Sequence, residues 1–150
     1  MLSAALATGW ELDWLWGLPL LVATVVFHVS AFLAMERALI FRVHHRGKRF
    51  PLAHFIGPIA TTALGAAALH AVEAGAWAAL YVRLGALSDH GTAMLYSLNA
   101  ITSYGHENVF LESQWRLLGA IEAMNGLILF GLTTAFLFAA IQVLRQGRTG

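Results

Sequence analysis

The chain contains no cysteine and few charged residues. Its 150 residues include no Cys and three Pro, and Asp, Glu, Lys and Arg together make up 11%. Without cysteine there is no disulfide framework, no thiolate metal site and no cysteine nucleophile. Because a soluble domain has roughly a quarter of its residues charged, this composition excludes an ordinary soluble protein.

Signatures of common enzymes and of nucleic-acid binding are also missing. The sequence has no Ser-His-Asp arrangement, no Walker motif and no HExxH motif, so we expect neither enzymatic activity nor a resident cofactor. The net charge of +1 gives no basis for nucleic-acid binding.

Hydrophobic sequence dominates instead. Hydrophobic residues make up 59% of the chain, and the mean hydropathy is +0.68. This composition predicts an all-α integral membrane protein, a single domain over residues 1–150 in contact with the lipid bilayer. Residues 1–13 lack the basic start of a cleavable signal peptide, so we expect the first apolar segment to be retained.

Three stretches are long enough to cross a bilayer, for which about 20 apolar residues suffice. They cover residues 14–41, 55–84 and 117–144. A fourth apolar run, residues 92–101, is too short, since a helix of that length reaches only about 15 Å. We therefore predict that this run enters the membrane and returns to the same side.

Basic residues predict the orientation. The segment Arg37–Arg49 contains five Lys or Arg, and Arg145 and Arg148 follow the third stretch. Lys and Arg accumulate in short cytoplasmic loops. We expect Arg37–Arg49 to be a cytoplasmic loop, the N-terminus to lie outside and the C-terminus to lie in the cytoplasm. Few residues follow the third stretch, so no soluble ligand-binding domain is expected.

The short apolar run leads into a polar turn formed by Thr102, Ser103, Tyr104, Gly105 and His106. Backbone carbonyls and Thr or Ser hydroxyls are the oxygens with which a filter replaces an ion's hydration shell. A turn at membrane depth is tolerated only where protein or a water-filled path surrounds it. The turn therefore suggests a pore.

With its flanks, this turn resembles the pore module of the potassium channel superfamily, whose filter reads T-V-G-Y-G-D. Tyr104 and Gly105 align with Tyr-Gly, Ser103 with the first Gly and His106 with the Asp. Upstream residues similar to the outer and pore helices of small bacterial members are Glu73, Trp77, Tyr81, Gly85, Ala93, Tyr96 and Ser97. Downstream residues similar to the inner helix are Trp115, Arg116, Leu117, Leu118, Glu122, Gly126 and Leu129. The resemblance runs from about His70 to Ile141.

The resemblance implies a homotetramer in a bacterial inner membrane, which conducts monovalent cations such as K⁺ passively. It implies an outer helix over 55–84, a re-entrant pore helix and filter loop over 92–106, and an inner helix over 117–144. The first stretch, 14–41, has no counterpart in the two-helix pore unit. Glycine adopts a positive φ without cost, whereas Ser103 meets a steric penalty. We therefore expect altered K⁺ selectivity.

Four polar residues near the filter are candidates for its support. Ser97 and Asn99 lie on the expected pore helix. Glu122 is an intramembrane acid and so a functional candidate, and Asn125 shares its face at i+3.

Two glycines of the third stretch are candidate gating hinges. Gly126 and Gly131 each lower helix propensity by about 1 kcal/mol relative to Ala. Close packing of the helix is the alternative interpretation of both.

Two histidines suggest a competing function. His28 lies near the middle of the first stretch and His70 near the middle of the second, and two imidazoles at similar depth can ligate a haem or a metal. Glu73 follows His70 at i+3, which predicts a local hydrogen bond between them. The alternatives to a channel are thus a small haem- or metal-binding redox protein and a non-conducting structural membrane protein.

Overall fold

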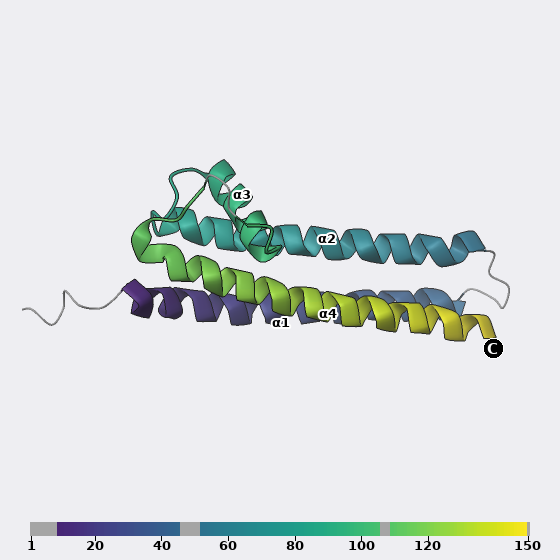
Figure 1. Ribbon diagram of the computed structural model, residues 1–150. Coiled ribbons are helices and arrows are strands. Elements are labelled where there is room, and N and C mark those ends of the chain that lie inside the picture. Colours follow the sequence, from purple (N-terminus) through teal and green to yellow (C-terminus); the bar gives the residue numbers. More distant parts are fainter. Residues whose placement is uncertain (1–8, 46–51, 106–108, 150) are drawn as a thin grey trace, which may run out of the picture.

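The structure is a computed structural model that describes residues 9–45, 52–105 and 109–149. Its regular elements are α1 (Gly9–His45), α2 (Leu52–Arg83), α3 (His90–Ile101), the 3₁₀ turn η1 (Ser113–Trp115) and α4 (Arg116–Thr149) (Figure 1). Every regular element in the described ranges is helical, which confirms the predicted all-α class.

Three of the helices are suited to a bilayer. The segments Trp10–Phe41 in α1, Ile56–Arg83 in α2 and Ser113–Arg145 in η1 and α4 are long and apolar enough to cross a membrane. Helix α3 has 12 residues and is far shorter. The prediction of three apolar, membrane-length helices is confirmed, and these helices suggest that the protein resides in a lipid bilayer.

The long helices extend beyond the stretches predicted from hydropathy. At five of their six ends, they run past the predicted ranges 14–41, 55–84 and 117–144; α2 alone ends one residue early, at Arg83. The expected loop Arg37–Arg49 is helical as far as His45, so that prediction is wrong for its first part. Hydropathy detects only the apolar part of a helix, whereas backbone hydrogen bonding also continues through polar residues.

Helices α1, α2 and α4 lie side by side, and α3 lies at one end of the molecule, beside the end of α2 and the start of α4 (Figure 1). Helix α4 packs mainly along α1, and α3 packs on α2 and α4. The largest hydrophobic cluster of the described residues forms where these elements meet, and it includes Trp77, Tyr81, Ala93, Tyr96, Ala100, Leu118 and Ile121. This cluster fixes α3 against the two long helices.

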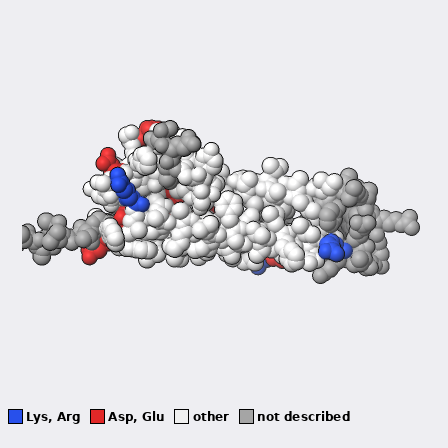
Figure 2. Space-filling model, viewed as in Figure 1, with Lys and Arg blue, Asp and Glu red and all other residues white. Residues whose placement is uncertain are grey.

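Large apolar side chains point outward along the long helices. Examples are Val22, Val26, Phe27, Leu33, Leu64, Val72, Leu127 and Phe138. On the face shown in Figure 2, charged side chains lie mainly toward the two ends, and most of the length between them is uncharged. An apolar surface between charged ends is what a bilayer requires of the helices that face it.

Candidate functional site

The turn after α3 is a helix C-cap in which a serine has a left-handed backbone. Ser103 has a φ of 55°, and it is the only non-glycine residue with positive φ in the described ranges. The Ser103 N–H donates to the Ala100 carbonyl oxygen at 3.0 Å. The Tyr104 N–H donates to the Asn99 carbonyl oxygen, also at 3.0 Å. This pair of bonds is a Schellman motif, which satisfies the last carbonyls of the helix.

The turn presents acceptors without partners. Thr102, Ser103, Tyr104 and Gly105 are all exposed, Tyr104 by 78%. The backbone N–H groups of Thr102, Ser103 and Tyr104 donate to carbonyl oxygens of α3. The carbonyl oxygens of residues 102–105 accept no hydrogen bond from any described residue. The Thr102 hydroxyl also donates into α3, to the Leu98 carbonyl at 2.6 Å. Because most of its backbone N–H groups are bonded to α3 and its carbonyl oxygens accept no hydrogen bond from the described residues, this turn is suited to a cation.

Close contacts hold the C-terminal end of α3 between α2 and α4. The Ser97 hydroxyl donates to the Ala74 carbonyl oxygen of α2 at 2.7 Å. The Ile101 backbone lies against Gly126 of α4, where an added Cβ would be 2.0 Å from the Ile101 carbonyl oxygen. Gly126 is ten residues into α4, or about 15 Å along its axis. Residues 109–115 lie at the end of the molecule where α4 begins, and Val109 and Leu111 pack in the same cluster as Trp115 and Leu118 (Figure 1).

Glu122 joins α4 to both α2 and α3. Its Oε2 accepts a hydrogen bond from the Tyr81 hydroxyl at 2.5 Å, its Oε1 contacts the Ser97 hydroxyl, and all three side chains are buried. Ser97 has a single hydroxyl proton but faces two acceptors, the Ala74 carbonyl oxygen and Glu122 Oε1. Both contacts become hydrogen bonds when Oε1 carries a proton and Ser97 donates to Ala74. The geometry therefore suits a neutral Glu122.

The other predicted support residues make different contacts. Asn125 lies on the same face of α4 as Glu122 but turns to α1, where it donates to the Thr24 hydroxyl oxygen at 2.8 Å. Asn99 contributes its backbone carbonyl to the C-cap of α3. His106 lies outside the described residues.

The two candidate hinge glycines differ in their surroundings. Gly126 is buried at the contact with Ile101, so its missing side chain permits the close approach of α3. Gly131 is exposed, and an added Cβ there would meet nothing within 4 Å. Gly126 is thus a close-packing position, whereas the space around Gly131 would accommodate a side chain.

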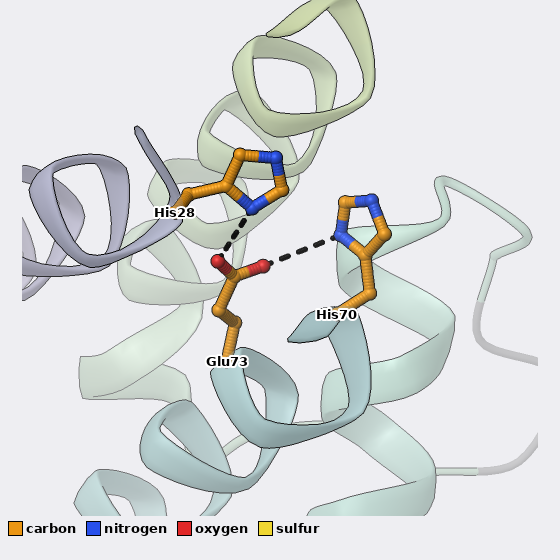
Figure 3. Close-up of side chains that lie close together, drawn as sticks. All are labelled: His28, His70 and Glu73. Carbon is orange, nitrogen blue, oxygen red and sulfur yellow. Dashed lines mark hydrogen bonds and ion pairs between the residues drawn. The ribbon is translucent and has the colours of Figure 1, made fainter. Parts of the chain in front are cut away.

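A second polar cluster lies within the three long helices. His28 Nδ1 is 2.7 Å from Glu73 Oε1, and His70 Nδ1 is 3.3 Å from Glu73 Oε2 (Figure 3). The Thr133 hydroxyl oxygen is 3.1 Å from His28 Nε2 and 3.0 Å from His70 Nε2. The predicted partners His70 and Glu73 are thus in contact, but without hydrogen-bonding geometry. The hydrogen bond of Glu73 goes instead to His28 of α1, a partner that was not predicted from the sequence.

The two imidazole rings are placed unfavourably for a haem. Their centroids are 5.2 Å apart, and Glu73 and Thr133 contact both rings. Two axial histidines approach a haem iron from opposite faces, so a porphyrin would have to separate these rings and break these contacts. A single ion needs far less space. His28, His70 and Glu73 offer ligand atoms that all lie within 4.8 Å of one another.

In the part of the chain that the structure describes, these features define an all-α protein with three membrane-length helices, a short helix and polar turn held between two of them, and two buried polar clusters. In comparisons with known proteins, no family model, no curated protein and no solved structure matches the chain. The α3 turn and the buried clusters are therefore the features from which a function is inferred.

Proposed function

We propose that the protein is a tetrameric cation channel of potassium-channel-like architecture. In this proposal α2 is the outer helix, α3 the pore helix, Thr102–His106 the filter and α4 the inner helix. The observation that carries it is the row of carbonyl oxygens of residues 102–105, which accept no hydrogen bond from the described residues. The row follows Ile101, which packs on Gly126 about 15 Å along α4. That distance is half of a hydrocarbon core about 30 Å thick.

Lipid is an unfavourable neighbour for such a turn. In hydrocarbon, each unsatisfied carbonyl costs several kcal/mol, so irregular backbone at this depth occurs where protein or water surrounds it. A single chain leaves residues 102–105 exposed. Association of several chains around a water-filled axis removes this cost, and the turn then lines the path.

Four copies around one axis follow from the resemblance to potassium channels. Their carbonyl and Thr102 hydroxyl oxygens would form stacked rings that replace the hydration shell of a monovalent cation. Glu122, through Ser97, and the contact between Gly126 and Ile101 would support these rings from behind.

Altered K⁺ selectivity is expected from Ser103. A left-handed conformation costs an L-residue about 1–2 kcal/mol, whereas glycine adopts it freely. The serine filter therefore holds its oxygens in place less firmly than a glycine filter. In the proposed orientation, the N-terminus is outside a bacterial inner membrane, the turn opens to the outside and the C-terminus is cytoplasmic.

Purified protein in proteoliposomes tests conduction. We expect K⁺ and Na⁺ flux above that of protein-free vesicles, and a higher ratio of K⁺ to Na⁺ flux for Ser103→Gly. Ser88→Gly, at an exposed position before α3, is the matched control and should keep the wild-type ratio. If wild type and Ser103→Gly both pass no cation at any pH tested, conduction is refuted and the non-conducting alternative stands.

The mass of the purified complex tests assembly separately. Four chains of 16.2 kDa give about 65 kDa of protein in one particle. A monomer or dimer in a lipid nanodisc would contradict a fourfold filter.

A further inference from the structure

The cluster of His28, His70, Glu73 and Thr133 has no role in the proposed ion path. It joins α1, α2 and α4, and the side chains of His28 and Glu73 are completely buried. Buried ionisable groups within membrane-length helices are expensive, and each such group is a functional candidate. Figure 3 shows the Glu73 carboxylate between the two imidazoles.

Two buried atoms of this cluster lack a partner. His70 Nδ1 and Glu73 Oε2 face each other at 3.3 Å without a hydrogen bond. Zinc binds imidazole nitrogen and carboxylate oxygen at about 2.0–2.1 Å, so two ligands of a tetrahedral ion are about 3.3 Å apart. These two atoms are therefore already spaced as ligands of one ion.

The Thr133 hydroxyl lies on the far side of both imidazoles, where its oxygen contacts the Nε2 atoms of His28 and His70. When both Nδ1 atoms bind a metal, each neutral imidazole carries its proton on Nε2. Both rings then donate to the Thr133 oxygen, which has two lone pairs to accept them. Metal-bound histidines usually have such a partner on the far nitrogen, which fixes the ring orientation.

We propose that His28 Nδ1, His70 Nδ1 and a Glu73 carboxylate oxygen bind a divalent transition-metal ion of the Zn²⁺ type, which links α1 to α2. Thr133 of α4 is the positioning residue. Binding through Glu73 Oε2 replaces the 2.7 Å hydrogen bond between His28 Nδ1 and Glu73 Oε1 by a bond from His28 Nδ1 to the ion. Two imidazoles and one carboxylate suit Zn²⁺ or Fe²⁺ better than the harder Mg²⁺ or Ca²⁺. The side chain of His70 is 12% exposed, so the cluster is not completely closed.

Metal binding to the full-length protein in detergent tests this site. After removal of metal with EDTA and reloading with Zn²⁺, we expect one zinc per chain by elemental analysis. Glu73→Gln and His70→Gln should bind at least tenfold less tightly. His90→Gln, at an exposed histidine, should bind as wild type. Helix content and elution volume establish that each variant is folded.

Comparing the zinc affinities of Thr133→Val and Thr134→Val tests the role of Thr133 most specifically. Loss of a residue that orients a metal ligand typically weakens affinity by about 10- to 100-fold, which we expect for Thr133→Val. Among the described residues, the Thr134 hydroxyl bonds only to the Phe130 carbonyl of its own helix, and its substitution should leave the affinity unchanged. Co²⁺ should give the visible absorption of a tetrahedral site in wild type and lose it in Glu73→Gln. Equal zinc affinity in wild type, Glu73→Gln and Thr133→Val, or no zinc in folded wild type, would overturn the proposal, whether or not the protein conducts ions.

Discussion

Replacement of Gly126 by alanine tests the contact that holds the end of α3 against α4. An added Cβ would lie 2.0 Å from the Ile101 carbonyl oxygen and 2.7 Å from its carbon. The obstacle is backbone, which cannot rotate away as a side chain does. The two helices must therefore separate by about 1 Å, and overpacking of this kind costs about 1–3 kcal/mol.

Helix propensity acts in the opposite direction. Alanine is favoured over glycine in a helix by about 1 kcal/mol. Taking the upper end of the overpacking cost, because backbone is displaced, we expect a net loss of about 2 kcal/mol for Gly126→Ala. Gly131→Ala is the matched control, because nothing lies within 4 Å of its added Cβ and only the favourable propensity remains.

Thermal unfolding in detergent, followed by tryptophan fluorescence, measures this difference. In a chain of this length, 1 kcal/mol shifts the Tm by about 2–4 °C. Gly126→Ala should therefore lower the Tm by roughly 4–8 °C, and Gly131→Ala should raise it by about 2–4 °C. If Gly126→Ala melts at or above the wild-type temperature, the close approach of α3 to α4 is not present in the protein.

Three further predictions concern the ends and the supports of α3. Glu122→Gln should keep a free energy of unfolding within about 1 kcal/mol of wild type, because an amide, like a protonated carboxyl, donates to Ser97 and accepts from Tyr81. Glu122→Leu makes neither bond and should lose about 2 kcal/mol or more. Equal losses in the two variants would refute a neutral Glu122. Ser103→Gly should raise stability by about 1 kcal/mol and Ser103→Val should lower it, so a more stable valine variant would exclude a left-handed residue 103. Hydrogen bonds from Thr92 lower the pKa of Asp89, so its capping carboxylate stabilises α3 at neutral pH, and this stabilisation is lost as pH falls through the lowered pKa. At pH 7, the Tm of Asp89→Ala should therefore be lower than the Tm of both wild type and Asp89→Asn. The difference in Tm between Asp89→Ala and wild type should shrink below about pH 4. A difference that does not change with pH would contradict this role.

The long helices could be predicted from the sequence because hydropathy alone identifies them. The apolar stretches 14–41, 55–84 and 117–144 lie within or almost within α1, α2 and α4. Their polar ends, including the helical residues through His45, could not be predicted in this way. Helix α3 was located within two residues of its start, because Asp89 and Ile101 bound a short apolar run.

Contacts between helices were harder to predict than contacts within them. The proximity of His70 and Glu73 follows from their i, i+3 spacing, and the structure places them 3.3 Å apart. The bond from His28 to Glu73 depends on how α1 is rotated against α2, which the sequence of α1 does not specify. The similar depth of His28 and His70 was the available signal, and it pointed to the right helices but not to the bridging carboxylate.

The support of α3 was predictable only in part. Glu122 was identified as an intramembrane acid that needs a partner, but nothing in its spacing indicated Tyr81 and Ser97 as the two partners. The role of Gly126 was likewise open, since a hinge and a close contact require the same residue type. Only the position of Ile101 against it distinguishes the two.

The accessibility of a single engineered cysteine tests the central claim most directly. The chain has no native cysteine, so Thr102→Cys carries one reactive site and Val72→Cys, 58% exposed on the side of α2, is its control. In proteoliposomes, a charged thiol reagent in water should modify Thr102→Cys and block its cation flux, while Val72→Cys in the lipid should remain unmodified and conducting. If Thr102→Cys reacts without any change in flux, or is as unreactive as Val72→Cys, the α3 turn does not line an ion path.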